Sequence, residues 1–263
     1  MVTLDDFEES EVRIDGVTRT LYRRGSGPAV IVMAEIPGIT PLVLSFADQV
    51  AQRGLTVVLP VLFGTPGKAP STPYAVRSLL GACVSKEFRI LASDASSPIT
   101  TWLRGLARIE HERCGGPGVG AIGMCLTGGF ALAMMVDDVV VAPVLSQPSL
   151  PAPFGARRQA ALGLSASELE RVRARVNAGT CVLGLRFTGD PAVRAARFDT
   201  LRTELGDGFI GVEIDSSEGN PWGHRRGAHS VLTEDLQDAP GTPTRAALEQ
   251  VLDFFSDRLV GSG

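Results

Sequence analysis

The fold is decided by residues Pro117–Met135, which read Pro-Gly-Val-Gly-Ala-Ile-Gly-Met-Cys-Leu-Thr-Gly-Gly-Phe-Ala-Leu-Ala-Met-Met. A short apolar strand leads into a glycine-rich turn and then into a helix of small residues, and Cys125 lies where strand and helix meet. This order is typical of a nucleophile elbow, a sharp turn that exposes one nucleophilic side chain at the carboxyl edge of a parallel sheet. The stretch therefore predicts that Cys125 is a nucleophile.

The surroundings of Cys125 support this prediction, with one departure. Backbone N–H groups and the positive dipole end at the start of the following helix favour a thiolate and a developing oxyanion. The tight form of the elbow has glycine two residues after the nucleophile, where this chain has Thr127, followed by Gly128 and Gly129. The alternative is that Cys125 is a small buried apolar residue, as free cysteines often are.

Length and composition predict one globular domain over residues 1–263. The chain is 44% hydrophobic and has a formal net charge of −4, and single α/β domains often reach this length with a full core. The mild acidic charge is spread along the sequence and gives no indication of a nucleic acid or an anionic membrane as partner. The longest apolar run, residues 139–145, is too short to span a bilayer.

The amino terminus and the cysteines indicate a cytoplasmic protein. The first ten residues have neither a basic nor an apolar signal region. Four cysteines are widely spaced and form no Cys-x-x-Cys pair, so we expect no disulfide framework and no structural zinc site; they are Cys83, Cys114, Cys125 and Cys181. Cys181 falls within an apolar run and is expected to be inert core.

Apolar runs alternate with helical patterns along the chain. We expect a hairpin over residues 11–22 and buried strands at 29–35, 55–60, 118–123, 139–145, 181–187 and 209–214. Helices are expected at 41–53, at 86–113 in two pieces, after the elbow, at 165–176, at 191–205 and at 243–259. Residues 61–85 are expected to form a long surface excursion. This alternation predicts an α/β fold with a mostly parallel, doubly wound sheet and helices on both faces.

A nucleophile elbow needs a base and an orienting acid, which follow it in the order acid, then histidine. Two histidines follow Cys125, His224 and His229, both in the polar loop between the last strand and the last helix. We favour His229, because the charge of Arg225 would oppose protonation of the neighbouring His224. Asp190 lies just past the strand 181–187 and is the candidate acid, although it also suits the N-cap of the next helix.

From about residue 11 onward the chain resembles the dienelactone hydrolase family, α/β-hydrolases with a Cys-His-Asp triad. The motifs that carry the resemblance are Gly123–Leu126 with the glycines after it, Phe187–Asp190, Ala228–Ser230 and Met33–Ile36. The resemblance implies an α/β-hydrolase fold in which Cys125 is the nucleophile, His229 the base and Asp190 its orienter. It implies no metal, flavin or nucleotide cofactor.

The resemblance also implies roles for residues after the first buried strand. A glutamate at the position of Glu35 contacts the resting thiol and accepts its proton when substrate arrives. The backbone N–H groups of Ile36 and Leu126 form the oxyanion hole. Without the resemblance, Glu35 could equally be a charged residue at a strand end that faces solvent.

The residues around the histidine depart from the dienelactone-cleaving members, which bind the substrate carboxylate with two arginines, one of them shortly after the histidine. Here Ser230–Thr233 contains no arginine, whereas Arg225 and Arg226 precede His229. We expect an apolar wall after His229, and hydrolysis of neutral small-molecule esters or lactones through an acyl-enzyme. The alternative is a non-catalytic member of the fold that binds small molecules or senses thiols. Whether the protein is a monomer or a homodimer stays open.

Overall fold

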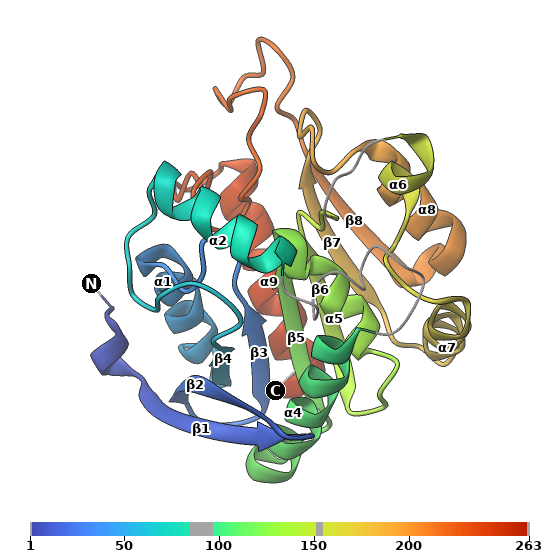
Figure 1. Cartoon of the computed structure of the whole chain (residues 1–263). Helices are drawn as coiled ribbons and strands as arrows, with labels where there is room; N and C mark the ends of the chain where they lie inside the picture. Colours follow the sequence, from blue (N-terminus) through green and yellow to red (C-terminus); the bar gives the residue numbers. More distant parts are fainter. Residues whose placement is uncertain (1, 85–96, 151–154, 262–263) are drawn as a thin grey trace.

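The computed structural model describes residues 2–84, 97–150 and 155–261, and an eight-stranded sheet forms the centre of this part of the chain (Figure 1). The strands are β1 (Glu8–Ile14), β2 (Val17–Gly25), β3 (Ala29–Met33), β4 (Thr56–Pro60), β5 (Val119–Met124), β6 (Val140–Ser146), β7 (Val182–Phe187) and β8 (Phe209–Ile214). Their order is β1-β2-β4-β3-β5-β6-β7-β8. The first two strands pair antiparallel and the other six run parallel, as the sequence predicts.

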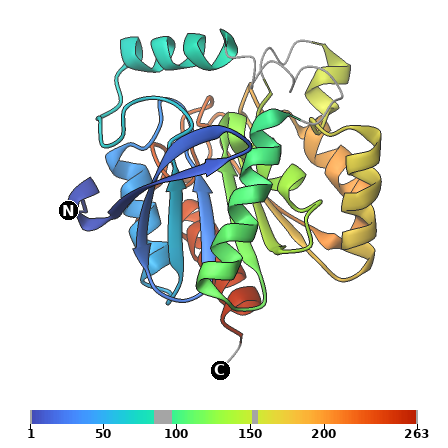
Figure 2. The same cartoon turned by 60° about the horizontal axis from the view of Figure 1, so that its bottom comes forward.

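Two layers of helices bury both faces of the sheet (Figure 2). Helices α1 (Pro41–Ala51) and α9 (Pro243–Leu259) pack on one face, and α4 (Pro98–Cys114), α5 (Gly128–Met134), α7 (Ala166–Asn177) and α8 (Ala195–Leu205) pack on the other. Alternate side chains of β3 supply the two cores: Val30 and Val32 join the first, Ile31 and Met33 the second. Burial on both faces explains why the parallel strands read as continuous apolar runs. No helix in the described part combines the length and apolar composition needed to cross a membrane.

Three local features differ from the expectations. The excursion after β4 contains the helix α2 (Thr72–Val84), which lies apart from both helix layers (Figure 2). The helix after β7 begins at Ala195 and has Arg194 at its N-cap, so Asp190 does not cap it. Instead, Asp190 Oδ1 accepts the Ala192 N–H at 2.8 Å, and this turn delays the start of the helix. A short helix, α6 (Ala156–Ala160), was not expected, and the first predicted helical piece of residues 86–113 lies mostly outside the described residues.

The elbow has the backbone that the sequence predicts. Cys125 lies in the left-handed region with φ of 58°, between β5 and a 3-10 turn that leads into α5. A Cβ on Gly123 would lie 2.0 Å from the Thr127 carbonyl oxygen, so only glycine allows this close approach.

Thr127 replaces the expected glycine because this position needs no left-handed backbone. Its φ is −85°, and its buried hydroxyl ties the elbow to the sheet. Thr127 Oγ1 accepts the N–H of Met124 at 2.8 Å and lies 2.8 Å from the carbonyl oxygen of Met33 on β3, to which it can donate. The departure from the tight motif is therefore a stabilising contact between neighbouring strands.

The two glycines that begin α5 allow a matched test of this packing. A Cβ on Gly128 would lie 2.6 Å from Pro148 Cα, whereas the nearest atom to a Cβ on Gly129 is the Leu162 oxygen at 3.6 Å. We expect Gly128→Ala to lower the free energy of unfolding by about 1–3 kcal/mol, the usual cost of overpacking. Gly129→Ala should leave it unchanged or slightly raise it, since alanine favours helix over glycine. Urea unfolding of both variants measures the difference, and equal effects would contradict the packing described here.

Candidate active site

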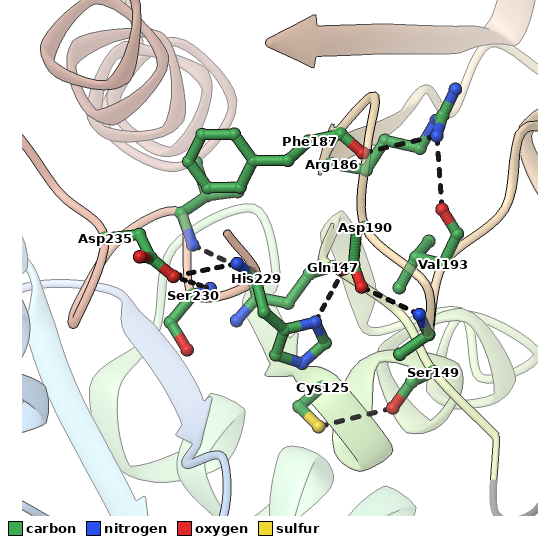
Figure 3. Close-up of polar contacts among 12 residues, drawn as sticks. Cys125, Gln147, Ser149, Arg186, Phe187, Asp190, Val193, His229, Ser230 and Asp235 are labelled. Atoms are coloured by element: carbon green, nitrogen blue, oxygen red, sulfur yellow. Dashed lines mark hydrogen bonds and ion pairs between the residues drawn. The ribbon is translucent and has the colours of Figure 1, made fainter. Parts of the chain in front are cut away.

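The structure brings together the three side chains predicted to form the triad (Figure 3). Cys125 follows β5, Asp190 follows β7 and His229 lies in the loop between β8 and α9. The ring of His229 lies between the other two side chains, and its Nδ1–H donates to Asp190 Oδ2 at 2.6 Å. Asp190 is 1% exposed, and its second oxygen is held by the Ala192 N–H. The carboxylate therefore orients an imidazole whose other edge faces the sulfur.

The charges around His229 favour its protonated form. Burial opposes protonation of the ring, but the Cys125 sulfur and the Asp190 carboxylate outweigh this effect and raise the pKa of His229 well above its ordinary value. The arrangement therefore favours a protonated imidazole at His229.

His224, the alternative base, lies elsewhere in the same loop. Its ring packs edge-on against Phe187, with ring centroids 5.0 Å apart, and its backbone is held by the side chain of Asn220. Burial lowers the pKa of His224, and the charges of Asp235 and Asp215 only partly offset this effect. Its Nε2 is buried and has no hydrogen-bond partner among the described residues. The geometry thus pairs Asp190 with His229.

A carboxylate that the sequence analysis missed holds the backbone of His229. Asp235 Oδ2 accepts the N–H of His229 at 2.8 Å and that of Ser230 at 3.1 Å. The guanidinium of Arg225 binds both oxygens of Asp235, at 2.8 and 3.0 Å. Burial opposes ionisation of Asp235, but Arg225 and the two N–H groups lower the pKa of its carboxyl. No local pattern marks Asp235, because its contacts depend on the path of the loop.

Glu35 is buried, and its contacts differ from the expected one. Its Oε2 accepts from Gln147 Nε2 at 3.0 Å and from Ser230 Oγ at 2.7 Å, and its Oε1 accepts from Thr233 Oγ1. Glu35 therefore neither faces solvent nor uses a hydrogen bond to the thiol in this structure. Its carboxylate anchors the residues that follow His229.

The sulfur of Cys125 meets a hydroxyl that the sequence analysis also missed. Ser149 Oγ lies 3.2 Å from Cys125 Sγ (Figure 3). Ser149 follows β6 after Gln147, a buried residue with φ of 36° that the sequence does not mark as unusual.

The two N–H groups expected to form an oxyanion hole, those of Ile36 and Leu126, have no acceptor among the described residues. Leu126 follows Cys125 directly, and Ile36 lies in the turn after β3, the strand beside β5. Unpaired donors beside a nucleophile suit the negative oxygen of a tetrahedral intermediate.

The remaining cysteines differ from Cys125 in their surroundings. Burial raises the pKa of the Cys114 thiol. Cys181 precedes β7 and is only half-buried, so the expectation of a core residue was wrong. The side chain of Cys83 lies outside what the structure describes. Within the described ranges no three His, Cys, Asp or Glu side chains form a cluster that could hold a metal ion.

The expected apolar wall after His229 was also wrong. Val231 and Leu232 are 0% and 1% exposed and belong to the core beneath the loop, because the hydrogen bonds of Glu35 and Gln147 turn this segment inward. Arg225 forms an ion pair with Asp235. Arg226 lines a pocket of about 720 Å³ together with Arg194 and other residues of the neighbouring loops.

Comparisons with known proteins agree with this geometry. The model of the dienelactone hydrolase family matches residues 15–257. A Saccharomyces cerevisiae protein with the provisional name carboxymethylenebutenolidase is 25% identical over 186 residues, which cover 71% of this chain and 66%, slightly less than two thirds, of that protein.

Solved structures show the same fold. A dienelactone hydrolase from Anabaena variabilis superposes with a TM-score of 0.61 at 17% identity, covering 97% of this chain and 99% of that one. A provisionally named dienelactone hydrolase from Klebsiella pneumoniae gives a TM-score of 0.64, also at 17% identity, covering 95% and 98%. With the sheet order, the elbow and a family match over most of its length, this chain belongs to the dienelactone hydrolase family and has the α/β-hydrolase fold.

Proposed function

We propose that this protein hydrolyses esters or lactones of small molecules through an acyl-enzyme formed on Cys125. Family membership supports the reaction class. One observation carries the mechanism: the elbow cysteine faces an imidazole whose Nδ1 lies 2.6 Å from a buried carboxylate. A protein that only sensed thiols or bound a small molecule would have no use for the Asp190–His229 pair. The chemistry needs a free thiol, which favours a reducing, cytoplasmic location.

In the proposed reaction the Cys125 thiolate attacks the carbonyl carbon of the substrate. The tetrahedral intermediate collapses, the carbon–oxygen bond of the ester breaks, and the imidazolium of His229 gives its proton to the leaving alkoxide. The neutral imidazole then takes a proton from water as the water attacks the thioester. Release of the carboxylic acid restores the thiolate and the imidazolium. Asp190 keeps its charge throughout and holds the ring in one orientation.

Two further roles belong to this proposal. The N–H groups of Ile36 and Leu126 bind the oxyanion, supported by their lack of other acceptors in the described part of the chain. Glu35 accepts the proton of any Cys125 that rests as a thiol, after substrate has displaced one of its three hydrogen-bond donors.

Substitution of the triad tests the proposal directly. Cys125→Ala should abolish hydrolysis of 4-nitrophenyl acetate, and His229→Ala should lower kcat/KM by about 100-fold or more, the usual contribution of general acid–base catalysis. His224→Ala should keep most of the activity, because His224 packs against Phe187 and does not pair with Asp190. Circular dichroism checks the fold of each variant. A loss in His224→Ala with none in His229→Ala, or full activity in Cys125→Ala, would refute the assignment.

The charge of the substrate is a second test. No arginine follows His229, and Arg225 is already bound to Asp235, so a substrate carboxylate lacks the cation that dienelactone-cleaving relatives provide. We expect kcat/KM to be at least about tenfold higher for the methyl ester of a lactone acid than for the free acid, because an unpaired charge costs 1–3 kcal/mol or more. A preference for the free acid that disappears at high salt would show that other cations of the site bind it.

A further inference from the structure

The hydroxyl of Ser149 touches the reacting atom of the proposed mechanism. Ser149 Oγ lies 3.2 Å from Cys125 Sγ and the residue is 4% exposed. The backbones are joined as well, since the Ser149 N–H donates to the Cys125 carbonyl at 2.9 Å. This second contact fixes the backbone of Ser149 relative to the elbow.

Two features bring the segment of Ser149 onto the elbow. Gln147 turns the chain at the end of β6 through a positive φ of 36°. Gly128 then admits Pro148, whose Cα would lie 2.6 Å from any Cβ at that position. The following residue, Ser149, is thereby placed over the nucleophile. Each feature is costly alone: left-handed backbone in a non-glycine residue is strained, and glycine weakens a helix.

A buried arginine also holds this segment. Arg197 on α8 is 3% exposed, and its guanidinium donates to the carbonyl oxygens of Pro148 and, at 3.0 Å, of Arg158. Burial lowers the pKa of Arg197 to about 10, against the attraction of Asp190, so the group stays charged at neutral pH. Charged groups are rarely buried without a specific task.

We propose that Ser149 is a further catalytic residue, which donates a hydrogen bond to the Cys125 thiolate, and that Arg197 is the positioning residue that holds it there. A thiolate has no proton to give, so the hydroxyl must be the donor, and no other described group forms a hydrogen bond with Ser149 Oγ. The inference rests on the proposed function for its mechanism and assigns the hydrogen-bond partner of the Cys125 thiolate to Ser149, whereas Glu35 acts only on Cys125 in its thiol form.

The pH dependence of alkylation at Cys125 tests the hydrogen bond without requiring hydrolysis. A donor to the thiolate favours the ionised form, so its removal makes ionisation harder. In Ser149→Ala, the midpoint of the pH profile for iodoacetamide alkylation should therefore rise by about one to two pH units, the effect of losing a hydrogen bond to a charged group. Peptide mass spectrometry separates Cys125 from half-buried Cys181. Ser149→Thr retains a hydroxyl and should keep the wild-type midpoint. Ser256→Ala on α9 removes a hydroxyl elsewhere and should not change the midpoint.

A double-mutant cycle tests Arg197. Arg197→Lys keeps the charge but loses the two-armed contact, and it should raise the midpoint by less than Ser149→Ala does. In the double variant Ser149→Ala/Arg197→Lys, the midpoint should equal that of Ser149→Ala alone, because the hydroxyl that Arg197 positions is gone. A midpoint in Ser149→Ala equal to that of the wild type, or additive shifts in the double variant, would overturn the inference. If Ser149→Ala raises the midpoint as expected but the protein hydrolyses no ester, only the proposed function is refuted.

Discussion

The left-handed backbone of Cys125 is the constraint on which the rest of the site depends. A non-glycine residue at φ of 58° is strained, and it persists because its neighbours leave no other path. Gly123 admits the Thr127 carbonyl, and the Thr127 hydroxyl ties the turn to β3. The same geometry directs the sulfur toward His229. The N–H of the next residue, Leu126, has no acceptor in the described part of the chain. The strained turn thus carries both groups that the proposed mechanism uses there.

The histidine is positioned by three carboxylates that have separate tasks. Asp190 holds the ring, Asp235 holds the backbone N–H of the same residue, and Glu35 holds the hydroxyl of the next residue. Arg225 neutralises Asp235 at the surface, while Glu35 is stabilised only by neutral donors in the described part of the chain. Buried carboxylates without such partners would take up protons and would no longer accept all of these hydrogen bonds. Small errors in the position of a catalytic base lower the rate steeply, so these contacts suit the role that we propose for His229.

The sequence predicted the features that local pattern and strand order determine. Glycine spacing marks the elbow at Cys125, and the order of parallel strands places Asp190 and His229 at the same edge of the sheet. It did not predict Ser149 or Asp235, because each contact depends on where a loop runs after its strand. The direction expected for the Val231 side chain was wrong for the same reason. Its burial follows from the hydrogen bond of its N–H to Gln147, which is 84 positions away in sequence.

The proposed mechanism requires a covalent acyl-enzyme on Cys125. Rapid-quench mixing with 4-nitrophenyl acetate, followed by intact-mass and peptide mass spectrometry, observes this intermediate directly. We expect a burst of nitrophenol that matches the fraction of protein acetylated. The acetyl group should be on Cys125 and should be lost at the rate of steady-state turnover. Turnover without any adduct, or an acetyl group that accumulates on Ser149 while Cys125 stays free, would contradict it.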